Sequence, residues 1–461
     1  MRKQHIVLGV APTKRSFLSM EEAKRQKDKF MGVIRQIHPD VVEIVDIDDL
    51  CENGILYETE KIPQVVEKFK KAGIDALFTP HCDFGEEQCA AGVAAALKVP
   101  TLMWGARDER PNTDESRGRD TQCGMFACTK VMKRFGVQYS YIWNCETESE
   151  DFKRGFDRFI RVVAVVKTVK NLCIAKFGAR PVPFMSVMAN EGDLATKLGI
   201  TVVPVSPTAI AARMDELIQG KDERLAEYLA DVKGRMDTSS MEEDKVTRAA
   251  AAKLAVQDLM EKNHCTAGAM ECWSAVPILG VPICMTLGEM ADEGLPISCE
   301  TDINGAVTLA MLQAVTLGKE SSFLADLTIR HPQNDNAELL WHCGPFPYSL
   351  KDAGCQARLV GGQERFELKK GDITVCRFDD CDGKYYLFGG EGRAVDGPQT
   401  NGTYVWFETD NWKRWEEKLM FGPYIHHVGG IYGNYKPVLR EAARYLGLIF
   451  DDADEQGVYS L

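Results

Sequence analysis

Two acidic residues and one histidine are the side chains of this sequence best suited to hold a divalent metal ion. Glu271 lies in the segment Ala-Met-Glu-Cys-Trp, and Asp302 lies in Ser-Cys-Glu-Thr-Asp-Ile-Asn-Gly, each at the end of an apolar run. His427 follows far downstream in Tyr-Ile-His-His-Val-Gly-Gly. Two carboxylates and one imidazole are ligands that suit an open, octahedral site. If these residues meet in the fold, the protein is predicted to be a metal enzyme.

Each of these residues also has a purely structural interpretation. Asp302 precedes a helix-like segment, so its side chain could simply cap that helix. Glu271 lies in an almost uncharged stretch, where a carboxylate is costly to bury unless it is paired or bound to a metal, but an exposed loop position is equally compatible. His427 is predicted to lie in a glycine-rich loop, and His342, which ends another apolar run, is the next candidate ligand. The residues alone leave both interpretations open.

The elements that must position these side chains follow two patterns. Up to about residue 330, strand-like and helix-like segments alternate, which predicts right-handed βαβ units and parallel sheets covered by helices. We expect strands at 6–10, 41–45, 76–79, 101–104, 139–143, 172–177, 201–205 and 295–299, and helices at 20–37, 63–72, 86–97, 125–135, 151–168, 208–217, 241–262 and 305–317.

After about residue 330 the pattern changes to short β-rich segments separated by Gly and Asp. These are predicted to be antiparallel hairpins of a barrel or sandwich, followed by a helix at 435–446. The expected fold is therefore α/β, with two Rossmann-like parallel-sheet domains and a C-terminal β-rich domain. The expected domains are 1–168, 169–332 with the carboxylates, and 333–461 with His427.

Composition excludes several classes of protein. The net charge is −13 and there is no long Lys/Arg run, so neither nucleic acid nor an anionic membrane is an expected partner. No stretch reaches the roughly 18 apolar residues of a membrane span, and the N-terminus lacks the features of a signal peptide. The fifteen cysteines include no Cys-x-x-Cys pair and are predicted to be reduced thiols. The protein is expected to be cytoplasmic.

Taken together, several segments resemble the L-fucose isomerase family. Glu-Thr-Asp-Ile-Asn-Gly around Asp302 is similar to the family's Glu-Asn-Asp-x-x-Asn-Gly, Met270-Glu271 is similar to its metal-binding Glu segment, and His426-His427 is similar to its Asn-His-Gly segment. Weaker matches are Thr-Pro-His81-Cys82-Asp-Phe-Gly and Trp-Gly-Ala-Arg-Asp-Glu-Arg-Pro.

The resemblance implies a metal-dependent aldose–ketose isomerase. It implies that Glu271, Asp302 and His427 bind Mn²⁺, with Mg²⁺ or Co²⁺ as substitutes, and that Glu271 and Asp302 also form the acid/base pair that moves a proton between C1 and C2 of an open-chain sugar. It further implies a homo-oligomer, trimeric or hexameric, with sites at subunit interfaces. The implied substrate contacts are Lys14, Arg15, His81, Cys82, His342 and His426.

Departures from the family concern the sugar rather than the metal. Cys82 replaces an aromatic residue and His426 replaces an Asn, which indicates a different sugar or lost activity. Lys14, Arg15 and the arginines of the Trp-Gly segment either form surface ion pairs or bind an anionic sugar, phosphorylated or sulfonated. The competing functions are a non-catalytic sugar-binding protein of the same fold and a metal-dependent hydrolase that uses His342 and His427. A cysteine-redox protein is disfavoured by the absence of paired cysteines.

Overall fold

The computed structural model describes residues 4–111, 115 and 117–457. The chain forms two compact units, one ending at Lys167 and the other beginning at Thr168. The expected fold class, two parallel-sheet α/β parts followed by a mostly antiparallel β part, is confirmed.

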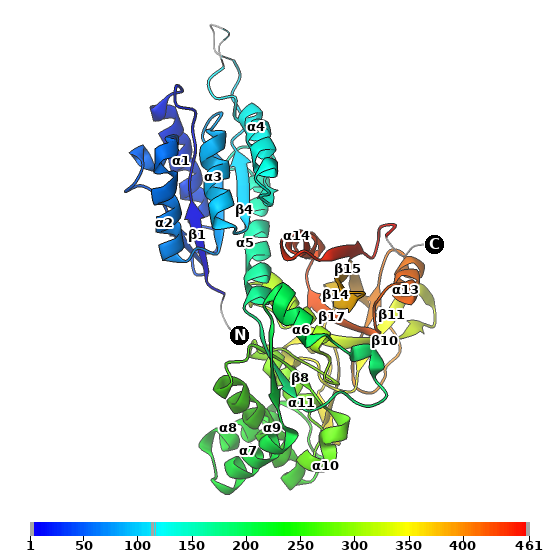
Figure 1. The fold of residues 1–461 in the computed structure, drawn as a ribbon. Helices are drawn as coiled ribbons and strands as arrows, with labels where there is room; N and C mark the ends of the chain where they lie inside the picture. The colour runs from blue at the N-terminus through cyan, green and yellow to red at the C-terminus, as the bar shows by residue number, and fades with distance from the viewer. Residues whose placement is uncertain (1–3, 112–114, 116, 458–461) are drawn as a thin grey trace. The chain divides into compact units, whose positions relative to one another are not determined.

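The first unit is built on a five-stranded parallel sheet with the strand order β2-β1-β3-β4-β5 (Figure 1, blue to cyan). All four pairings are parallel, as the alternating sequence pattern predicted. The strands are β1 (Ile6–Val10), β2 (Val42–Val45), β3 (Ala76–His81), β4 (Thr101–Gly105) and β5 (Tyr139–Tyr141), and the helices are α1 (Met20–Ile34), α2 (Ile62–Ala72), α3 (Glu87–Leu97), α4 (Thr121–Arg134) and α5 (Glu150–Lys170).

The second unit begins with a four-stranded parallel sheet in the order β7-β6-β8-β9. Its core consists largely of Ala, Leu, Ile and Met side chains from the strands and from long helices, the green segments of Figure 1. The strands are β6 (Cys173–Phe177), β7 (Thr201–Val205), β8 (Ala267–Met270) and β9 (Ile297–Ser298). The helices are α6 (Glu191–Asp193), α7 (Pro207–Gln219), α8 (Glu223–Arg235), α9 (Glu243–Lys262), α10 (Val276–Leu279), α11 (Cys284–Asp292) and α12 (Ile303–Val315).

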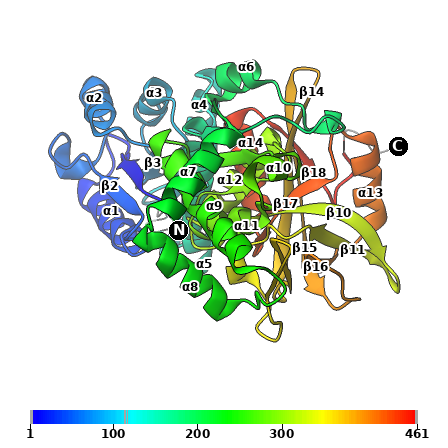
Figure 2. The same cartoon turned by 90° about the horizontal axis from the view of Figure 1, so that it is seen from below.

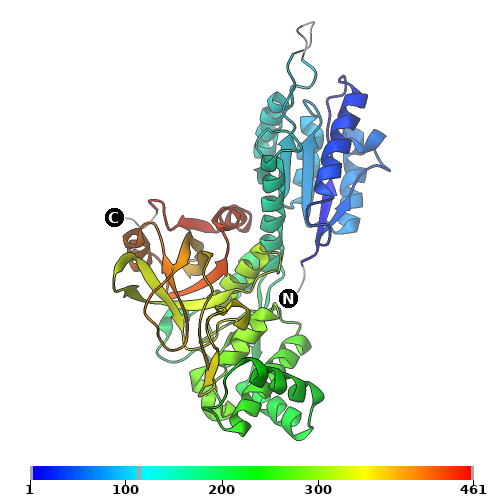
Figure 3. The same ribbon diagram turned by 180° about the vertical axis from the view of Figure 1, so that it is seen from behind.

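The rest of the second unit is a barrel, seen from behind in Figure 3 (yellow to red). Six strands close it in the order β16-β11-β10-β17-β14-β15, because β15 also pairs with β16, and all six pairings are antiparallel. The elements are β10 (Phe323–His331), β11 (Asn334–His342), β12 (Arg358–Val360), β13 (Gln363–Glu367), β14 (Asp372–Cys381), β15 (Lys384–Val395), β16 (Thr403–Glu408), α13 (Trp412–Phe421), β17 (His427–Tyr432), α14 (Lys436–Leu446) and β18 (Ile449–Asp452).

Helix α12 joins the two sheets of this unit. It packs against β8 and β9 of the parallel sheet and against β14 and β17 of the barrel (Figure 2). Every residue in it is buried. A helix that is apolar on all sides belongs in such an interior position. Its N-terminus, with Asp302, therefore lies where the parallel sheet meets the barrel.

The predicted loop around His427 is wrong, because His427 begins the barrel strand β17. The glycines that suggested a loop are required by close packing. A Cβ atom at Gly430 would lie 2.2 Å from the ring of Phe323, and one at Gly429 would lie 2.6 Å from Leu312 of α12. These glycines let the helix and the neighbouring strand approach β17, which fixes His427 on a rigid strand.

Among the described residues, no single helix is both long and apolar enough to cross a membrane. The sharply bent pair Trp273–Leu279 and Cys284–Asp292 has the necessary length and composition, and nothing more.

Candidate functional site

Asp302 and His427 meet at the junction of α12 and the barrel. His427 Nδ1 lies 3.0 Å from Asp302 Oδ2, and both side chains are fully buried. Asp302 is also the N-cap of α12, because its Oδ1 accepts a hydrogen bond of 2.8 Å from the backbone N–H of Gly305. The two interpretations that the sequence left open for Asp302, helix cap and site residue, are therefore compatible in one conformation.

Arg377 on β14 takes the remaining hydrogen-bonding capacity of Asp302. Its Nη1 donates to Asp302 Oδ2 and its Nη2 donates to Oδ1 at 3.2 Å, while its Nε donates to Asp379 at 3.0 Å. With Gly305 and His427, protein donors occupy all of the roughly four lone-pair positions of the Asp302 carboxylate. Burial alone would raise the pKa of Asp302, but the Arg377 guanidinium and His427 hold that pKa well below its usual range.

The backbone that leads into Asp302 is strained. Glu300 and Thr301 have φ values of 59° and 56°, the left-handed region that non-glycine residues rarely adopt. Two consecutive residues of this kind cost about 1–3 kcal/mol each and persist mainly at functional sites. In this conformation the Glu300 carboxylate reaches His427, with its Oε2 3.0 Å from Nε2.

The contact with Asp302 settles which nitrogen of His427 carries a proton. Because Asp302 is an ionised carboxylate that can only accept, His427 Nδ1 donates, and in the neutral ring Nε2 is the acceptor. Nε2 faces Glu300 Oε2 at 3.0 Å and Asp326 Oδ1 at 3.4 Å, yet it has no hydrogen-bond partner among the described residues. Burial opposes a charge on this ring, but the contacts with Asp302 and Glu300 raise the pKa of His427 to about 9, so at pH 7 both nitrogens carry protons unless a cation takes the Nε2 lone pair.

Three imidazoles converge on Asp326, a residue of β10 that the sequence analysis did not single out. The Nε2 atoms of His427, His426 and His342 lie 3.4, 3.9 and 4.0 Å from Asp326 Oδ1. Neither Asp326 Oδ1 nor His342 Nε2 has a hydrogen-bond partner in the described part of the chain. The ligand atoms of Asp326, His426 and His427 lie within 4.8 Å of one another. We call Glu300, Asp326 and His427 the centre.

His342 has the opposite tautomer to His427. Its Nδ1 accepts a hydrogen bond of 2.9 Å from the backbone N–H of Cys343, so the proton of the neutral ring is on Nε2. This Nε2 lies 4.0 Å from Asp326 Oδ1, which is too far for a hydrogen bond.

Glu271, the other predicted carboxylate ligand, has a hydrogen-bond partner of its own, apart from Asp302 and His427. It follows β8, it is half-buried, and its Oε2 accepts a hydrogen bond of 2.8 Å from the backbone N–H of Ala179. The described residues show no hydrogen bond or ion pair between Glu271 and either Asp302 or His427. The ring of Phe184 lies 6.2 Å from that of Trp273 and 6.1 Å from that of His427. The Ala179–Phe184 segment thus touches both Glu271 and the centre.

The four predicted contacts of the first unit form a local cluster around β3. The Arg15 guanidinium pairs with Glu86 at 3.1 Å and lies over the Phe84 ring at 4.4 Å. Lys14 is buried and donates to backbone carbonyls of its own loop.

His81 and Cys82, the other two members of this cluster, are both buried. Burial lowers the pKa of His81 to about 4, so this imidazole is neutral at pH 7. Burial likewise keeps the Cys82 thiol protonated, because it raises the pKa far above the usual value. Their proposed contact with a sugar stays a prediction.

Four cysteines form a chain of thiol contacts beside the centre. Cys284 Sγ lies 3.6 Å from Cys343 Sγ, and hydrogen bonds link Cys343 to Cys299 and Cys299 to Cys272. The thiols of Cys272 and Cys299 and the Glu300 carboxylate lie within 4.8 Å of one another. The sequence analysis treated these thiols as scattered, because they come from four separate segments.

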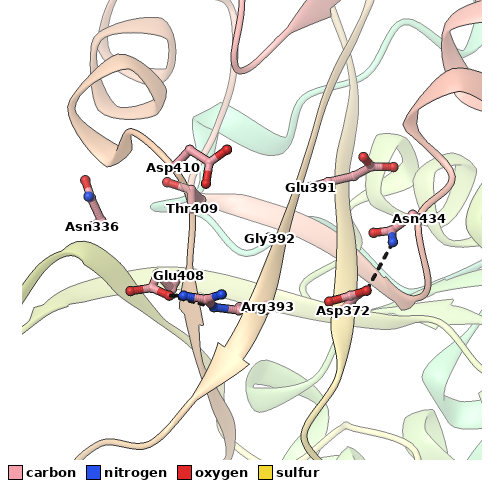
Figure 4. A pocket seen from close by; sticks show the side chains of 9 residues that line it. All are labelled: Asn336, Asp372, Glu391, Gly392, Arg393, Glu408, Thr409, Asp410 and Asn434. Carbon is pink, nitrogen blue, oxygen red and sulfur yellow. Dashed lines mark hydrogen bonds and ion pairs between the residues drawn. The ribbon is translucent and has the colours of Figure 1, made fainter.

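A separate hollow of about 430 Å³ opens on the barrel (Figure 4). It is acidic and contains none of the predicted site residues. Arg393 pairs there with Glu408, and Asn434 donates to Asp372 at 3.1 Å. Its lining residues are Asn336, Asp372, Glu391, Gly392, Arg393, Glu408, Thr409, Asp410 and Asn434.

Sequence reasoning missed Glu300, Asp326 and Arg377 as site residues. Asp326 in Phe-Leu-Ala-Asp-Leu and Arg377 in Thr-Val-Cys-Arg-Phe are single charges inside apolar strand segments. That is the same signal that singled out Glu271, since a lone buried charge needs a partner. Glu300 was quoted within its motif, but only the fold brings it to His427.

A divalent cation fits the chemistry of the centre. Two carboxylates and an imidazole nitrogen converge, and neither Asp326 Oδ1 nor His427 Nε2 has a hydrogen-bond partner among the described residues. Oxygen ligands with one imidazole suit Mn²⁺, Mg²⁺ or Co²⁺. The divalent site around His427 stays a prediction.

Known protein families match this chain at both ends. The profile described as "Fucose/sulfoquinovose isomerase, N-terminal domain" matches residues 9–170, which include the first parallel sheet. The profile described as "L-fucose isomerase, C-terminal domain" matches residues 359–453, which include Arg377 and His427.

Curated relatives align over most of the chain. A sulfoquinovose isomerase of Priestia aryabhattai is 24% identical over 409 residues, 87% of this chain and 90% of that protein. Sulfoquinovose isomerases of Alkalicoccus urumqiensis and Clostridium sp. are 26% and 25% identical, over 72% and 81% of this chain and 75% and 85% of those proteins. Because the N-terminal and C-terminal family models match in order and the curated relatives align across both, this chain belongs to the L-fucose isomerase-like family.

Proposed function

We propose that this protein is an aldose–ketose isomerase that acts on a sulfonated sugar and depends on a divalent metal ion. The observation that carries the proposal is the buried centre around His427. The chain also aligns with 90% and 75% of the length of two relatives that are named sulfoquinovose isomerases. Mn²⁺ is the proposed ion, with Mg²⁺ or Co²⁺ as substitutes. The ligand set implied by the family, Glu271, Asp302 and His427, stays a prediction.

The reaction requires a proton to move between C1 and C2 of the open-chain sugar. A bound divalent ion would polarise the carbonyl group and stabilise the enediolate. Of the two predicted acid/base residues, Glu271 is better placed to move the proton. Its carboxylate is half-buried and has a single hydrogen bond, from Ala179, whereas Asp302 is enclosed by four donor contacts.

Aromatic side chains beside the centre are proposed to limit access of water. Phe184 lies 6.1 Å from the rings of both His426 and His427. His426 is about two-fifths exposed, with a side-chain exposure of 43%, so it can reach a sugar hydroxyl from the open side of the centre. Exclusion of water protects an enediolate from side reactions.

The test is conversion of defined sugars by the full-length protein with added Mn²⁺. Neutral, phosphorylated and sulfonated aldoses, sulfoquinovose among them, are followed by NMR for a 2-ketose of unchanged mass. We expect turnover of the sulfonated sugar and a loss of at least about 100-fold in kcat for Glu271→Gln, the lower range for general acid–base catalysis. The control Glu261→Gln, at an exposed position of α9, should match wild type.

Two outcomes would contradict the proposal. Binding of the sulfonated sugar without turnover would favour the sugar-binding protein, and release of two products would favour the hydrolase. Equal activity of Glu271→Gln and wild type would remove Glu271 from the reaction.

A further inference from the structure

Two cysteines from different parts of the second unit have sulfur atoms within reach of each other. Cys284 is the first residue of α11, and Cys343 follows His342 at the end of β11. Cys284 Sγ lies 3.6 Å from Cys343 Sγ. We propose that hydrogen peroxide oxidises Cys343, which then forms a reversible disulfide with Cys284. The modification itself goes beyond the proposed function, whereas its effect on turnover rests on that function.

Close packing of α11 against the segment after β11 brings these two thiols together. Cys284 and Gly288 are four residues apart, so they share one face of α11. A Cβ atom at Gly288 would clash with the backbone oxygen of Phe346. The missing side chain therefore lets the chain beyond Cys343 approach α11 about one turn after Cys284. The proximity of the two thiols thus follows from the way in which these elements pack.

The backbone around Cys343 is held on both sides. Gly344 has a φ of 134°, which favours glycine, and a Cβ atom there would lie 2.6 Å from the backbone nitrogen of Glu364. The backbone N–H of Cys343 donates to His342 Nδ1 at 2.9 Å. A disulfide holds its sulfur atoms about 2.05 Å apart, so the two Sγ atoms must approach by about 1.5 Å. Rotation of the two side chains is the movement that we expect.

Exposure decides which thiol meets the oxidant first. Cys343 is half-buried, whereas Cys284 is only 3% exposed. Because oxidation of cysteine follows access, Cys343 is the attacked thiol and Cys284 is the resolving thiol, the usual arrangement in redox-sensing pairs. The two residues are 59 positions apart in the sequence, so the search for Cys-x-x-Cys pairs did not find them.

The oxidation takes two balanced steps. The Cys343 sulfur attacks one oxygen atom of hydrogen peroxide, the O–O bond breaks, a sulfenic acid forms and one water molecule leaves. Cys284 Sγ then attacks Cys343 Sγ, so that the S–S bond forms, the S–O bond breaks and a second water molecule leaves with the Cys284 thiol proton. The two thiols lose two protons and two electrons, and the peroxide is reduced to water. Exchange with dithiothreitol restores both thiols.

The disulfide is proposed to act on the centre through His342. Cys343 Sγ lies 3.3 Å from His342 Nδ1, and the His342 ring lies 6.3 Å from the His427 ring. Movement of the sulfur towards Cys284 breaks its contact with His342 and ties the end of β11 to α11. Because His342 is a predicted substrate contact, the disulfide should lower turnover of the sulfonated sugar.

Mass spectrometry of the full-length protein tests the modification without any substrate. The protein is treated with hydrogen peroxide in the presence of dimedone, which traps sulfenic acids, and is then digested and mapped. In the wild type we expect two peptides joined through Cys284 and Cys343, with the loss of two hydrogen atoms. Cys284→Ala should instead carry dimedone on Cys343, because its resolving thiol is absent. If Cys284→Ala does not fold, Cys284→Ser replaces it.

A second pair of thiols provides the matched control. Cys173 Sγ also lies 3.6 Å from Cys265 Sγ. This pair lies at the amino ends of β6 and β8, whereas Glu271 and Glu300 follow the carboxyl ends of β8 and β9. Peroxide should lower turnover by about 10-fold in the wild type and in Cys265→Ala, as expected for a lost hydrogen bond to substrate, and dithiothreitol should restore it. In Cys343→Ala, treated and untreated protein should turn over equally.

The outcomes distinguish this proposal from the proposed function. A free Cys343 thiol after treatment, or a disulfide from Cys343 to Cys299, would overturn the assignment whatever the protein does to sugars. A Cys284–Cys343 disulfide in a protein that converts no sugar would support the modification and overturn the isomerase proposal. An equal loss of turnover in Cys343→Ala and the wild type would overturn the link between the disulfide and turnover.

Discussion

Two arginines that could bind the anionic group of the sugar, Arg15 and Arg180, differ in whether a carboxylate is already paired with them. The guanidinium of Arg15 is paired with Glu86 and Glu87. Arg180, in the segment whose Ala179 holds Glu271, forms no ion pair among the described residues and donates only to backbone carbonyls of Pro181 and Val182. A sulfonate is an anion, and the N–H donors of a guanidinium group bind such anions well. Arg180 is therefore the better candidate for binding the sulfonate.

This difference predicts how the two arginines affect substrate choice. Arg180→Ala should raise KM for the sulfonated sugar by about 10–100-fold, as expected for loss of a charged hydrogen bond, and should leave KM for a neutral aldose nearly unchanged. Arg15→Ala, the matched comparison, should have a smaller effect because Arg15 is already paired. Steady-state kinetics with both sugars provide the measurement. A selective effect of Arg15→Ala alone would restore the earlier prediction that Arg15 binds the anionic group.

At the scale of elements, α12 and β14 are joined by a buried ion pair. Arg377→Met would leave Asp302 and Asp379 without their cation, which should cost about 3–5 kcal/mol in the free energy of unfolding. Arg393→Met on β15 is the control, because Arg393 is mostly exposed beside Glu408 and such pairs contribute about 0–1 kcal/mol. Urea unfolding followed by tryptophan fluorescence compares the midpoints. Equal shifts for the two variants would contradict this account of the junction.

Strand β11 carries a carboxylate whose titration should affect stability. Burial raises the pKa of Glu338 to about 7, although Arg330 works in the opposite direction. The folded protein therefore binds the Glu338 proton more tightly than the unfolded chain does, and this tighter binding stabilises the fold. The stabilisation is complete below the ordinary pKa of a glutamate and is lost as pH rises through about 7.

The direction of this pKa shift predicts how substitution of Glu338 changes the free energy of unfolding at different pH values. Glu338→Gln should change stability little near pH 4 and should increase it at pH 8 by up to about 3 kcal/mol. Glu408 is the control of opposite sign, because hydrogen bonds from Asn334 and Arg393 lower its pKa, so Glu408→Gln should lose stability at pH 8. Thermal melting at both pH values is the measurement. A Glu338→Gln variant that is less stable than wild type at pH 8 would contradict the prediction.

The sequence predicted whole elements better than it predicted the site. Alternation of apolar and polar segments identified every strand of the first parallel sheet, because helix and strand periods are local properties. The hairpin β10–β11 was missed because its outer ends are polar and exposed, so only part of each strand is apolar. The centre depends on the pairing of β10 with β17, a contact between distant segments that no local pattern encodes.

At the scale of the whole molecule, exposed apolar side chains in the second unit support the predicted homo-oligomer. Val182, Met185 and Trp273 are 88%, 70% and 50% exposed, although they lie in the segments beside Glu271 and Phe184. Large apolar side chains gathered in this way are typical of interaction surfaces. We therefore expect a trimer or hexamer that buries these residues.

Light scattering coupled to gel filtration tests this expectation. The wild type at micromolar concentration should have the mass of a trimer or hexamer, and Val182→Asp/Met185→Asp should shift the mass towards the monomer, because a charge is costly to bury at an interface. Ile329→Asp, at an exposed barrel position, should leave the mass unchanged. A monomeric wild type would contradict the prediction.

Removal and return of the metal ion tests the central claim most directly. The full-length protein is stripped with a chelator and assayed on the sulfonated aldose, then assayed again after addition of Mn²⁺, in parallel with His427→Ala. The account predicts no ketose from the stripped wild type, recovery with Mn²⁺, and no recovery in His427→Ala. Full turnover by the stripped wild type, or Mn²⁺-restored turnover by His427→Ala, would contradict a metal-dependent isomerase centred on His427.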